Sequence, residues 1–375
     1  MRYRKFGNTG IDISVLGFGA MRLPSENKGG KTVFDYEESA RMMLRAYESG
    51  VNYFDTAPGY CGGESEIIVG RALKNIRDKV YISTKYSVGS DSGGDCRKGL
   101  EKSLTQLDTD YIDFYHMWGI DLDTFNSKVT APNGPLAEVR KAKEEGLIRH
   151  ISFSFHDDAD NLMKIAESKE FETVLVQYNL LDRSNEKAIT KARELGLGIV
   201  AMGPVGGGRL GEESEKIRAM LPKRVRSNPE IALRFVLTNP NIHCALSGMS
   251  TMAQVEENCL TASKDEILSE AEIRTINATV SEIRKLAELY CTECEYCMPC
   301  PEGVNIPLCF RLMNFHKVYE ITNYARTEYA TIGKFDWMPG KDASFCTECG
   351  ACESKCPQKL AIREQLRETH SALAG

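Results

Sequence analysis

The sequence lacks several features that would assign it to whole classes of protein. No stretch reaches the roughly 18 apolar residues of a membrane-spanning helix, and residues 1–5 are not followed by an apolar segment of signal-peptide length. We therefore expect a cytoplasmic protein without a membrane partner. An excess of basic residues is also missing, because the net charge is −6 over 375 residues. This balance argues against a nucleic-acid partner.

A glycine-rich dinucleotide fingerprint is absent after the first predicted strand, which weakens the case for a doubly wound open sheet. Short apolar runs instead alternate with amphipathic stretches, as expected for a parallel sheet in an α/β protein. Eight such units over about 250 residues predict a closed (β/α)8 TIM barrel. The strand candidates are residues 13–18, 51–54, 80–84, 111–115, 148–153, 174–177, 198–202 and 243–246.

Cysteines are concentrated near the C-terminus in two runs that each end in Cys-Pro, a spacing typical of ligands for iron–sulfur cubes. A disulfide knot or a pair of zinc sites is the alternative, and a reducing cytoplasm disfavours the knot. In the two-cluster pattern each run gives its first three cysteines to one cube and its fourth to the other. The eight predicted metal ligands are Cys291, Cys294, Cys297, Cys300, Cys346, Cys349, Cys352 and Cys356.

The rest of the tail predicts a helix-rich dicluster iron–sulfur domain. About 45 residues separate the two cysteine runs, and residues 308–324 have helical character. We expect the barrel to occupy residues 1–265, a helical connector 266–290 and the iron–sulfur domain 291–375. Free cysteines outside the runs behave as small buried apolar residues. They are Cys61, Cys96, Cys244, Cys259 and Cys309.

Three side chains that could transfer a proton follow the second and third predicted strands. Asp55 and Tyr60 come after the second strand and Lys85 ends the third. Because barrel chemistry sits at the carboxyl ends of the strands, we expect them to converge. An ammonium group at Lys85 lowers the pKa of a neighbouring phenol, and Asp55 would hold Lys85 in place. Tyr60 could then protonate a carbonyl oxygen as general acid.

Several segments resemble the aldo-keto reductase family over about residues 1–265. They are residues 5–10, residues 16–21, the Asp55-Thr56-Ala57 turn with Tyr60, Lys85, and the stretches around Gln177, Pro204 and Asn258. Within that family the fused cysteine module is similar to a subgroup of predicted oxidoreductases. The resemblance implies NAD(P)H bound across the barrel mouth, with Tyr60 as acid and Lys85 and Asp55 tuning it. The residues that it implies for cofactor binding are Gly19, Met21, Ser154, Gln177, Met202, Gly206, Gly248, Gln254, Glu257 and Asn258.

The sequence departs from this family at the substrate pocket. The family usually has a histidine five residues after the aspartate of its fourth-strand motif, and counting from Asp113 reaches Trp118. His116 lies two residues earlier, on the same barrel face but about one layer deeper. Two substrate-pocket candidates result: Trp118 as a wall, and His116 as either a substrate contact or a satisfied interior histidine.

The cofactor segments depart from the family as well. Phe155 stands in place of the usual asparagine beside Ser154, and Met202 in place of the aromatic residue that stacks on the nicotinamide. Residues 248–254 contain no lysine or arginine to hold a 2′-phosphate. NADH is therefore at least as plausible as NADPH. A bound flavin is a further option, with the glycine-rich residues 203–208 as a weak phosphate-binding candidate.

Three functions remain open at this point. The first is a carbonyl reductase or alcohol dehydrogenase that uses NAD(P)H and carries two [4Fe–4S] clusters for electron transfer or structure. The second is a reductase that receives electrons from a ferredoxin-like partner and uses another bound redox cofactor, because cubes pass single electrons whereas nicotinamide passes a hydride. The third is a non-catalytic electron-transfer or redox-sensing protein.

Overall fold

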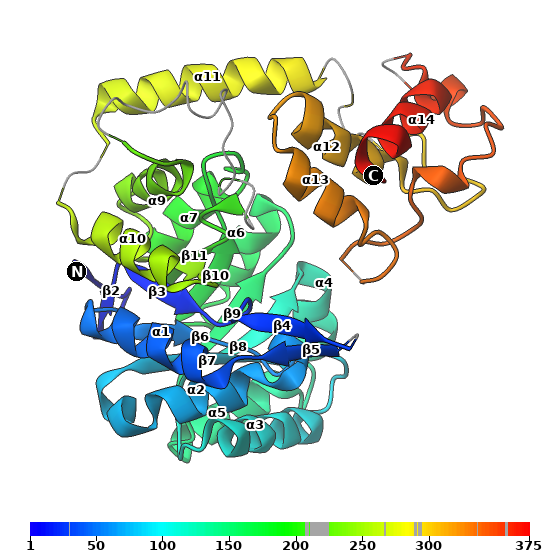
Figure 1. Cartoon of the computed structure of the whole chain (residues 1–375). Helices are drawn as coiled ribbons and strands as arrows, with labels where there is room; N and C mark the ends of the chain where they lie inside the picture. Colours follow the sequence, from blue (N-terminus) through cyan, green and yellow to red (C-terminus); the bar gives the residue numbers. More distant parts are fainter. Residues whose placement is uncertain are drawn as a thin grey trace. The chain divides into compact units, whose positions relative to one another are not determined.

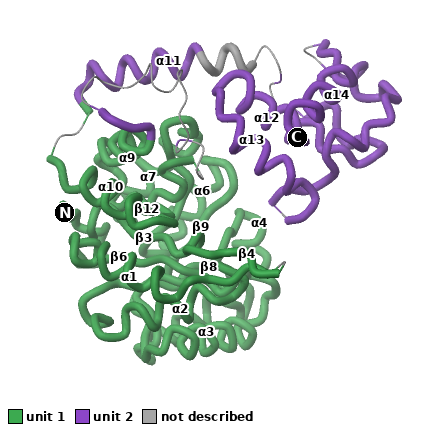
Figure 2. The backbone as a smooth tube through the Cα atoms, viewed as in Figure 1, with its two compact units in different colours: residues 1–207, 229–268 green, residues 208–228, 269–375 purple. Residues whose placement is uncertain are grey.

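The computed structural model describes residues 1–29, 31–206, 210, 225–265, 268–288, 291, 295–335, 337–356 and 359–375. The chain forms two compact units (Figure 2). Unit 1 contains residues 1–207 and 229–268, and unit 2 contains residues 208–228 and 269–375. Among the described residues no helix is long and apolar enough to cross a membrane.

Unit 1 is a closed barrel of eight parallel strands, as the alternation of apolar runs predicts (Figure 1). The order around the barrel is β10-β11-β12-β3-β6-β7-β8-β9, so each strand lies beside its sequence neighbour in the barrel. The strands are β3 (Leu16–Gly19), β6 (Tyr53–Asp55), β7 (Tyr81–Ser87), β8 (Ile112–Ile120), β9 (Ile148–Phe155), β10 (Thr173–Gln177), β11 (Gly198–Met202) and β12 (Cys244–Gly248).

Helices cover the outside of the barrel and begin at residues suited to that position. Asp35, Ser92, Asp158 and Thr251 cap α1, α3, α6 and α10 by accepting a backbone N–H in the first turn. The helices are α1 (Tyr36–Glu48), α2 (Ser65–Leu73), α3 (Gly93–Leu107), α4 (Leu122–Thr124), α5 (Pro135–Glu144), α6 (Ala159–Glu167), α7 (Glu186–Glu194), α9 (Asn228–Thr238) and α10 (Met252–Ser263).

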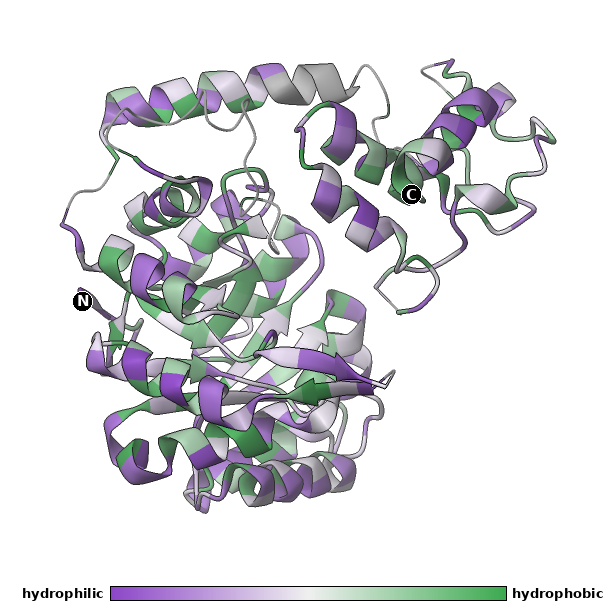
Figure 3. Cartoon of the chain, viewed as in Figure 1, coloured by the Kyte–Doolittle hydropathy of each residue, from purple (hydrophilic) through white to green (hydrophobic). Residues whose placement is uncertain are grey.

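The core of the barrel is apolar and is closed at its N-terminal end by Phe6. Figure 3 shows hydrophobic residues gathered on the strands and hydrophilic ones on the outer helices. Phe6 comes from a hairpin of β1 (Tyr3–Lys5) and β2 (Asp12–Ser14), and its ring lies 5.3 Å from Phe114 and 6.4 Å from Tyr53 between centroids. Large side chains thus fill this end of the barrel, as in other (β/α)8 folds.

Two hairpins fall outside the eight-strand prediction. The first is the β1–β2 hairpin that carries Phe6; Ile13 and Ser14 of β2 belong to the predicted strand 13–18, so that prediction merged the end of β2 with the barrel strand β3. The second pairs β4 (Ser25–Lys28) with β5 (Lys31–Phe34) directly after the first barrel strand. The residues of β4 are all exposed and polar or charged, so neither apolar periodicity nor burial marks this strand in the sequence.

Unit 2 is rich in helices, as the tail sequence predicts. Its helices are α11 (Glu270–Glu288), α12 (Ile306–Lys317), α13 (Thr322–Tyr329) and α14 (Ile362–Leu373). The expected helical segment 308–324 is two helices, because α12 ends at Lys317 and the chain turns before α13. Residues of α12, α13 and α14 share one apolar cluster that includes Phe310, Ala325 and Leu366.

The five cysteines outside the two runs are buried, which confirms that prediction. Cys61, Cys96, Cys244 and Cys259 lie in unit 1 and Cys309 in unit 2, and each exposes 8% of its surface or less. Burial raises the pKa of the Cys96 and Cys309 thiols to about 12. These side chains therefore stay protonated and pack as small apolar groups.

A buried histidine links the stability of the barrel to pH. His243 is 1% exposed, and its Nδ1 accepts a hydrogen bond from the backbone N–H of Ile199 at 2.8 Å. Burial, with smaller contributions from Arg193 and Arg4, lowers its pKa from 6.5 to about 3. Between these two values the unfolded chain binds more protons than the folded one, so folding stability falls as the pH falls through this window.

We expect the free energy of unfolding to drop by about 2 kcal/mol between pH 6.5 and pH 5 through His243, at about 1.4 kcal/mol per pH unit. Urea unfolding followed by Trp118 fluorescence in a Trp337→Phe background measures this for unit 1. His243→Asn should flatten the pH dependence. It should not abolish it, because burial also lowers the pKa of His116, to about 4. An unchanged slope in His243→Asn contradicts the assignment.

Candidate active site at the barrel mouth

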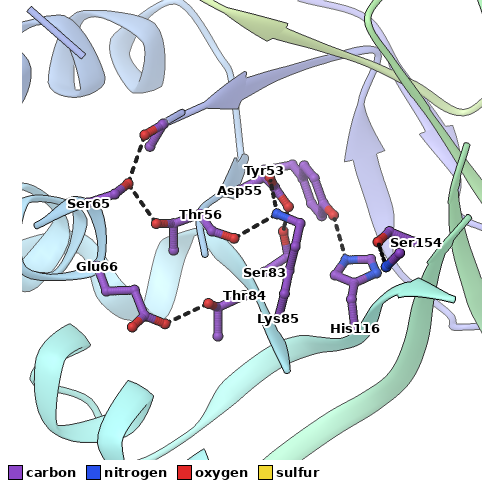
Figure 4. A network of polar contacts seen from close by, with 12 residues as sticks. Tyr53, Asp55, Thr56, Ser65, Glu66, Ser83, Thr84, Lys85, His116 and Ser154 are labelled. Carbon is purple, nitrogen blue, oxygen red and sulfur yellow. Dashed lines mark hydrogen bonds and ion pairs between the residues drawn. The ribbon is translucent and has the colours of Figure 1, made fainter. Parts of the chain in front are cut away.

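Lys85 is the centre of a buried polar network at the carboxyl end of the barrel (Figure 4). It lies on β7 and is 1% exposed. Its Nζ donates to Asp55 Oδ1 at 2.7 Å and to the Thr56 carbonyl oxygen at 2.7 Å. A fully buried ammonium is stable only when it is paired and hydrogen-bonded, and these two acceptors meet that requirement.

Neighbouring elements hold Asp55 and its turn in place. The second carboxylate oxygen of Asp55 accepts from the Ser83 hydroxyl at 2.7 Å. At the start of α2, Ser65 Oγ lies 2.7 Å from Thr56 Oγ1 and donates to the Ala20 carbonyl at 2.7 Å. The strand ends of β3 and β6 are thereby tied to one helix.

A buried carboxyl group supports β7 from the opposite side. Glu66 of α2 has no exposed surface, and its Oε1 accepts from Thr84 Oγ1 at 2.6 Å. Burial raises the pKa of Glu66. Thr84 directly precedes Lys85 in the strand, so this contact fixes the backbone from which the lysine projects.

Tyr60 lies beside Asp55 and Lys85, as predicted for residues that follow neighbouring strands at the same end of the barrel. It begins the short 3₁₀ turn Tyr60–Gly63 after β6. Lys85 Nζ lies 4.5 Å from the centroid of its ring, within cation–π range. The Trp118 ring packs edge-on against the Tyr60 ring, with 5.6 Å between the ring centroids and 88° between the ring planes. The structure thus brings the three proposed catalytic side chains and Trp118 together.

Burial keeps Tyr60 protonated. Burial raises the pKa of Tyr60 above its usual value of 10, and Lys85 lowers it by less than burial raises it. The prediction that Lys85 brings the pKa of Tyr60 towards neutrality is therefore wrong, because the effect of burial is larger than that of Lys85. Burial alone would lower the pKa of Lys85, but contact with Asp55 and Tyr60 raises it overall. At neutral pH the pair is a phenol beside an ammonium.

His116 lies inside the barrel with no exposed surface. Its Nε2 is 3.5 Å from the Tyr53 hydroxyl, and its Cα pairs with those of Lys85 and Ser152 in the neighbouring strands. Burial lowers its pKa from 6.5 to about 4, and Asp55 and the Phe153 backbone offset only part of this. The imidazole is therefore neutral and enclosed beneath the mouth.

Ser154 and two glycines lie at the mouth where the resemblance implies a dinucleotide. Ser154 Oγ accepts from the backbone N–H of Gly119 at 2.7 Å, which leaves its hydroxyl proton available to a ligand. Gly19 pairs with Gly248 across β3 and β12. A Cβ on Gly19 would lie 3.4 Å from the Ser247 carbonyl oxygen and 3.5 Å from the Gly248 nitrogen, which is ordinary van der Waals contact. Phe155, in contrast, is fully buried against Phe153.

Gln177 and Met202 are register partners at the ends of β10 and β11, and both are partly exposed. Gly203 follows with φ of +61°, and a Cβ there would lie 2.9 Å from the Gln177 amide group. Gly206 also has a left-handed φ, of +62°. Of the candidate segment 203–208, residues 207 and 208 lie outside the described residues.

The remaining cofactor candidates lie at or near α10. Gln254 Oε1 accepts from the Ser250 backbone N–H at 2.7 Å, and so its side chain caps the helix. Asn258 is buried and donates to Ser247 Oγ at 3.2 Å. Glu257 is exposed on the same helix, and Met21 is 48% exposed after β3.

Cysteines of both runs come together in unit 2. Cys352 is 8% exposed and belongs to the buried apolar cluster against which Cys346 and Cys300 also pack. Cys300 belongs to the first run and the other two to the second. Cys291, Cys297, Cys300, Cys346 and Cys356 also pack against the apolar cluster of this unit. Cys294 lies outside the described residues.

The two cysteine loops share a backbone feature. Glu295 and Gly350 directly follow the second cysteine of each run, and both have a left-handed φ, of +62° and +76°. Left-handed residues in such loops turn backbone N–H groups towards an anionic centre. No three His, Cys, Asp or Glu side chains of the described residues are grouped as ligands of a single metal ion, but a cube holds its thiolates farther apart than one ion does.

One residue at the mouth was not identified from the sequence. His156 directly follows β9, and a Cβ on Gly119 would lie 3.6 Å from its Cδ2. The available signal was its position: like Tyr60, it is a polar side chain just beyond a predicted strand.

The comparison with known families agrees with this geometry. Residues 15–280 match the aldo/keto reductase family, and residues 290–361 match the 4Fe-4S dicluster domain. The chain belongs to the aldo/keto reductase family. It combines an oxidoreductase barrel of this family with a C-terminal 4Fe-4S dicluster domain, as the sequence predicts.

Relatives of known sequence and structure cover the barrel. The uncharacterized oxidoreductase YqkF of Bacillus subtilis is 29% identical over 74% of this chain and 96% of its own length. The L-galactose dehydrogenase of Arabidopsis thaliana is 27% identical over 76% of this chain and 94% of its own. The holo form of the aldo-keto reductase AKR11C1 from Bacillus halodurans is 27% identical, with a TM-score of 0.64 over 74% of this chain and 96% of that one.

Removing the charge of Asp55 should destabilise the barrel strongly. Asp55→Asn leaves the buried Lys85 ammonium without its counter-charge, which costs about 3–5 kcal/mol of unfolding free energy. Ser83→Ala is the matched control, because it removes only one hydrogen bond to the same carboxylate and should cost about 1 kcal/mol. Urea unfolding at pH 7 compares them, and equal losses would show that the ion pair contributes no special stability.

Proposed function

We propose that the protein is an NAD(P)H-dependent oxidoreductase that interconverts a small carbonyl compound and its alcohol in the cytoplasm. The observation that carries this proposal is the contact of Tyr60 with the buried Lys85–Asp55 pair. A phenol beside an ammonium at an accessible barrel mouth is suited to proton transfer at an oxygen atom.

Each of the three side chains has a distinct role in this proposal. Tyr60 donates its hydroxyl proton to the carbonyl oxygen during reduction and takes it back during alcohol oxidation. Lys85 stabilises the phenolate that forms when the proton leaves. Asp55 keeps Lys85 charged and fixes its direction. Because burial raises the pKa of Tyr60, the acid form persists through the neutral pH range.

The residues at the mouth fit a nicotinamide dinucleotide. Ser154 and Gln177 would offer polar groups to a nicotinamide, Met202 would offer a thioether in place of an aromatic face, and Gly19 and Gly248 carry no side chain at the mouth. When bound, this cofactor supplies or accepts the hydride. Residues 248–254 contain no cationic side chain to hold a 2′-phosphate, which supports use of NADH at least as much as NADPH. Trp118 forms an apolar wall of the substrate pocket.

We assign two [4Fe–4S] clusters to the tail, with the domain boundaries expected from the sequence. Cys346, Cys349 and Cys352 would bind one cube together with Cys300, and the contact of Cys300, Cys346 and Cys352 with one apolar cluster is consistent with this crossed set. Cys291, Cys294, Cys297 and Cys356 would bind the other. The cubes would stabilise a unit with a small core and exchange single electrons with a ferredoxin-like partner.

Tyr60→Phe should abolish nicotinamide-linked turnover, because it removes the proton donor and keeps the ring over Lys85. Protein purified anaerobically is titrated with NADH and NADPH and assayed with para-nitrobenzaldehyde. The iron content, the sulfide content and the absorbance of the clusters serve as the control, and none of them should change. Turnover close to the wild-type rate in Tyr60→Phe would remove Tyr60 from the mechanism.

Pairs of cysteine variants distinguish crossed from uncrossed ligation. If Cys300 and Cys346 bind the same cube, the two single variants to serine and the double variant should each retain about four of about eight irons per chain. The pair Cys297 and Cys346 is the control, and its double variant should lose both cubes. Loss of all iron in the double variant of Cys300 and Cys346 contradicts the crossed set.

A further inference from the structure

A cavity of about 490 Å³ lies beside the second cysteine run in unit 2. Its wall includes Glu348 and Glu353 from the cysteine loop, and Arg363 and Arg367 from the first turns of α14. Cys349, which directly follows Glu348, is exposed. The loop of this run is therefore open to solvent on a side where charged groups of both signs surround it.

An ion pair joins the cysteine loop to α14. Glu353 begins the 3₁₀ turn Glu353–Lys355, between the third and fourth cysteines of the run. Its Oε2 lies 2.8 Å from Arg363 Nη2, and its Oε1 accepts from the Arg363 backbone N–H at 3.1 Å. The carboxylate thus binds both the side chain and a backbone amide in the first turn of the helix, where an acidic group is favoured.

The Arg363 guanidinium faces the turn between the second and third cysteines of the run. Gly350 follows Cys349 with a left-handed φ of +76°, and a Cβ there would lie 3.9 Å from both Cζ and Nε of Arg363. The Glu353 backbone N–H donates to the Gly350 carbonyl oxygen at 3.2 Å. The turn, the carboxylate and the guanidinium are therefore contiguous.

The apolar cluster of unit 2 holds both ends of this ion pair in place. Cys352 directly precedes Glu353, and Ile362 directly precedes Arg363. Both preceding residues belong to the cluster and are 8% and 1% exposed. Leu366, one helical turn after Ile362, is also 1% exposed. The backbone that carries each charge is thus fixed relative to the cysteine loop.

Both groups carry their charges at neutral pH. An arginine stays protonated in proteins, and contact with Arg363 lowers the pKa of Glu353. A cube that takes up one electron gains one negative charge, so a nearby cation favours its reduced form and a nearby carboxylate its oxidised form. The two opposite effects offset each other only while the pair is intact.

We propose that the Glu353–Arg363 ion pair sets the reduction potential of the cube bound by Cys346, Cys349 and Cys352. The proposal rests on the assignment of two cubes to the tail and adds residues that tune one of them. Neither residue is a ligand, and each acts through space on the bound cube, as groups around metal ligands commonly do. The ease of reduction would then depend on the position of α14 as well as on the thiolates.

Opposite substitutions test this electrostatic role in the intact holoprotein. Cube reduction is followed by EPR during an anaerobic titration with dithionite and mediators. Arg363→Gln leaves the carboxylate uncompensated, so the ratio of reduced to oxidised cube at a fixed potential should fall roughly fivefold. Glu353→Gln should raise this ratio by a similar factor, and the double variant should restore it. Shifts of the same sign in the two single variants, or no shift in either, overturn the proposal.

Two further variants separate charge from packing. Arg363 is 44% exposed, so its substitution spares the apolar cluster. Arg363→Lys keeps the charge and should keep the wild-type ratio within roughly twofold. Lys317→Gln is the matched control, because Lys317 pairs with Glu368 between α12 and α14, outside both cysteine runs. A shift in Lys317→Gln as large as that in Arg363→Gln overturns the assignment to this ion pair.

Iron and sulfide analysis separates this proposal from the cluster assignment on which it rests. Wild-type protein with about eight irons per chain, whose cubes do not respond to the opposite substitutions, overturns the role of the ion pair alone. Wild-type protein that is purified anaerobically without iron overturns both.

Discussion

The ion pair between Lys85 and Asp55 is the constraint on which the mouth of the barrel depends. Two buried charges are tolerated only because Thr56 and Ser83 satisfy their remaining hydrogen-bonding capacity. Ser65 and Glu66 of α2 in turn fix the backbone on either side. The position of Tyr60 above the ammonium follows from this arrangement. A helix on the outside of the barrel thus fixes the backbone that carries the buried ion pair on its inside.

The two units carry different redox chemistry. A nicotinamide passes two electrons at once as hydride, whereas a cube passes one. The barrel contains a site suited to the first and the tail contains thiols suited to the second. Because Cys300 and Cys352 come from different cysteine runs and both contact one apolar cluster, iron would connect segments that share a small apolar core. Structural and electron-carrying roles of the cubes are compatible in this unit.

Much of this molecule could be predicted from local sequence patterns, and what could not depends on tertiary environment. The eight strands followed from apolar runs, and the grouping of Asp55, Tyr60 and Lys85 followed from their place after neighbouring strands. The net pKa shift of Tyr60 was mispredicted because it depends on burial, which a pairwise argument omits. The β4 strand was missed because its exposed residues carry no apolar periodicity.

Phe6 closes the end of the barrel opposite the mouth, and this limits how deuterium from the solvent reaches the barrel interior. Tyr53 packs against Phe6, its hydroxyl lies 3.5 Å from His116 Nε2, and neither side chain has exposed surface. A ligand that covers the mouth would therefore slow deuterium uptake in side-chain layers that it never contacts. Deuterium exchange at these interior side chains would therefore report whether a ligand occupies the barrel mouth. The hairpin that carries Phe6 would set the exchange rate measured without ligand.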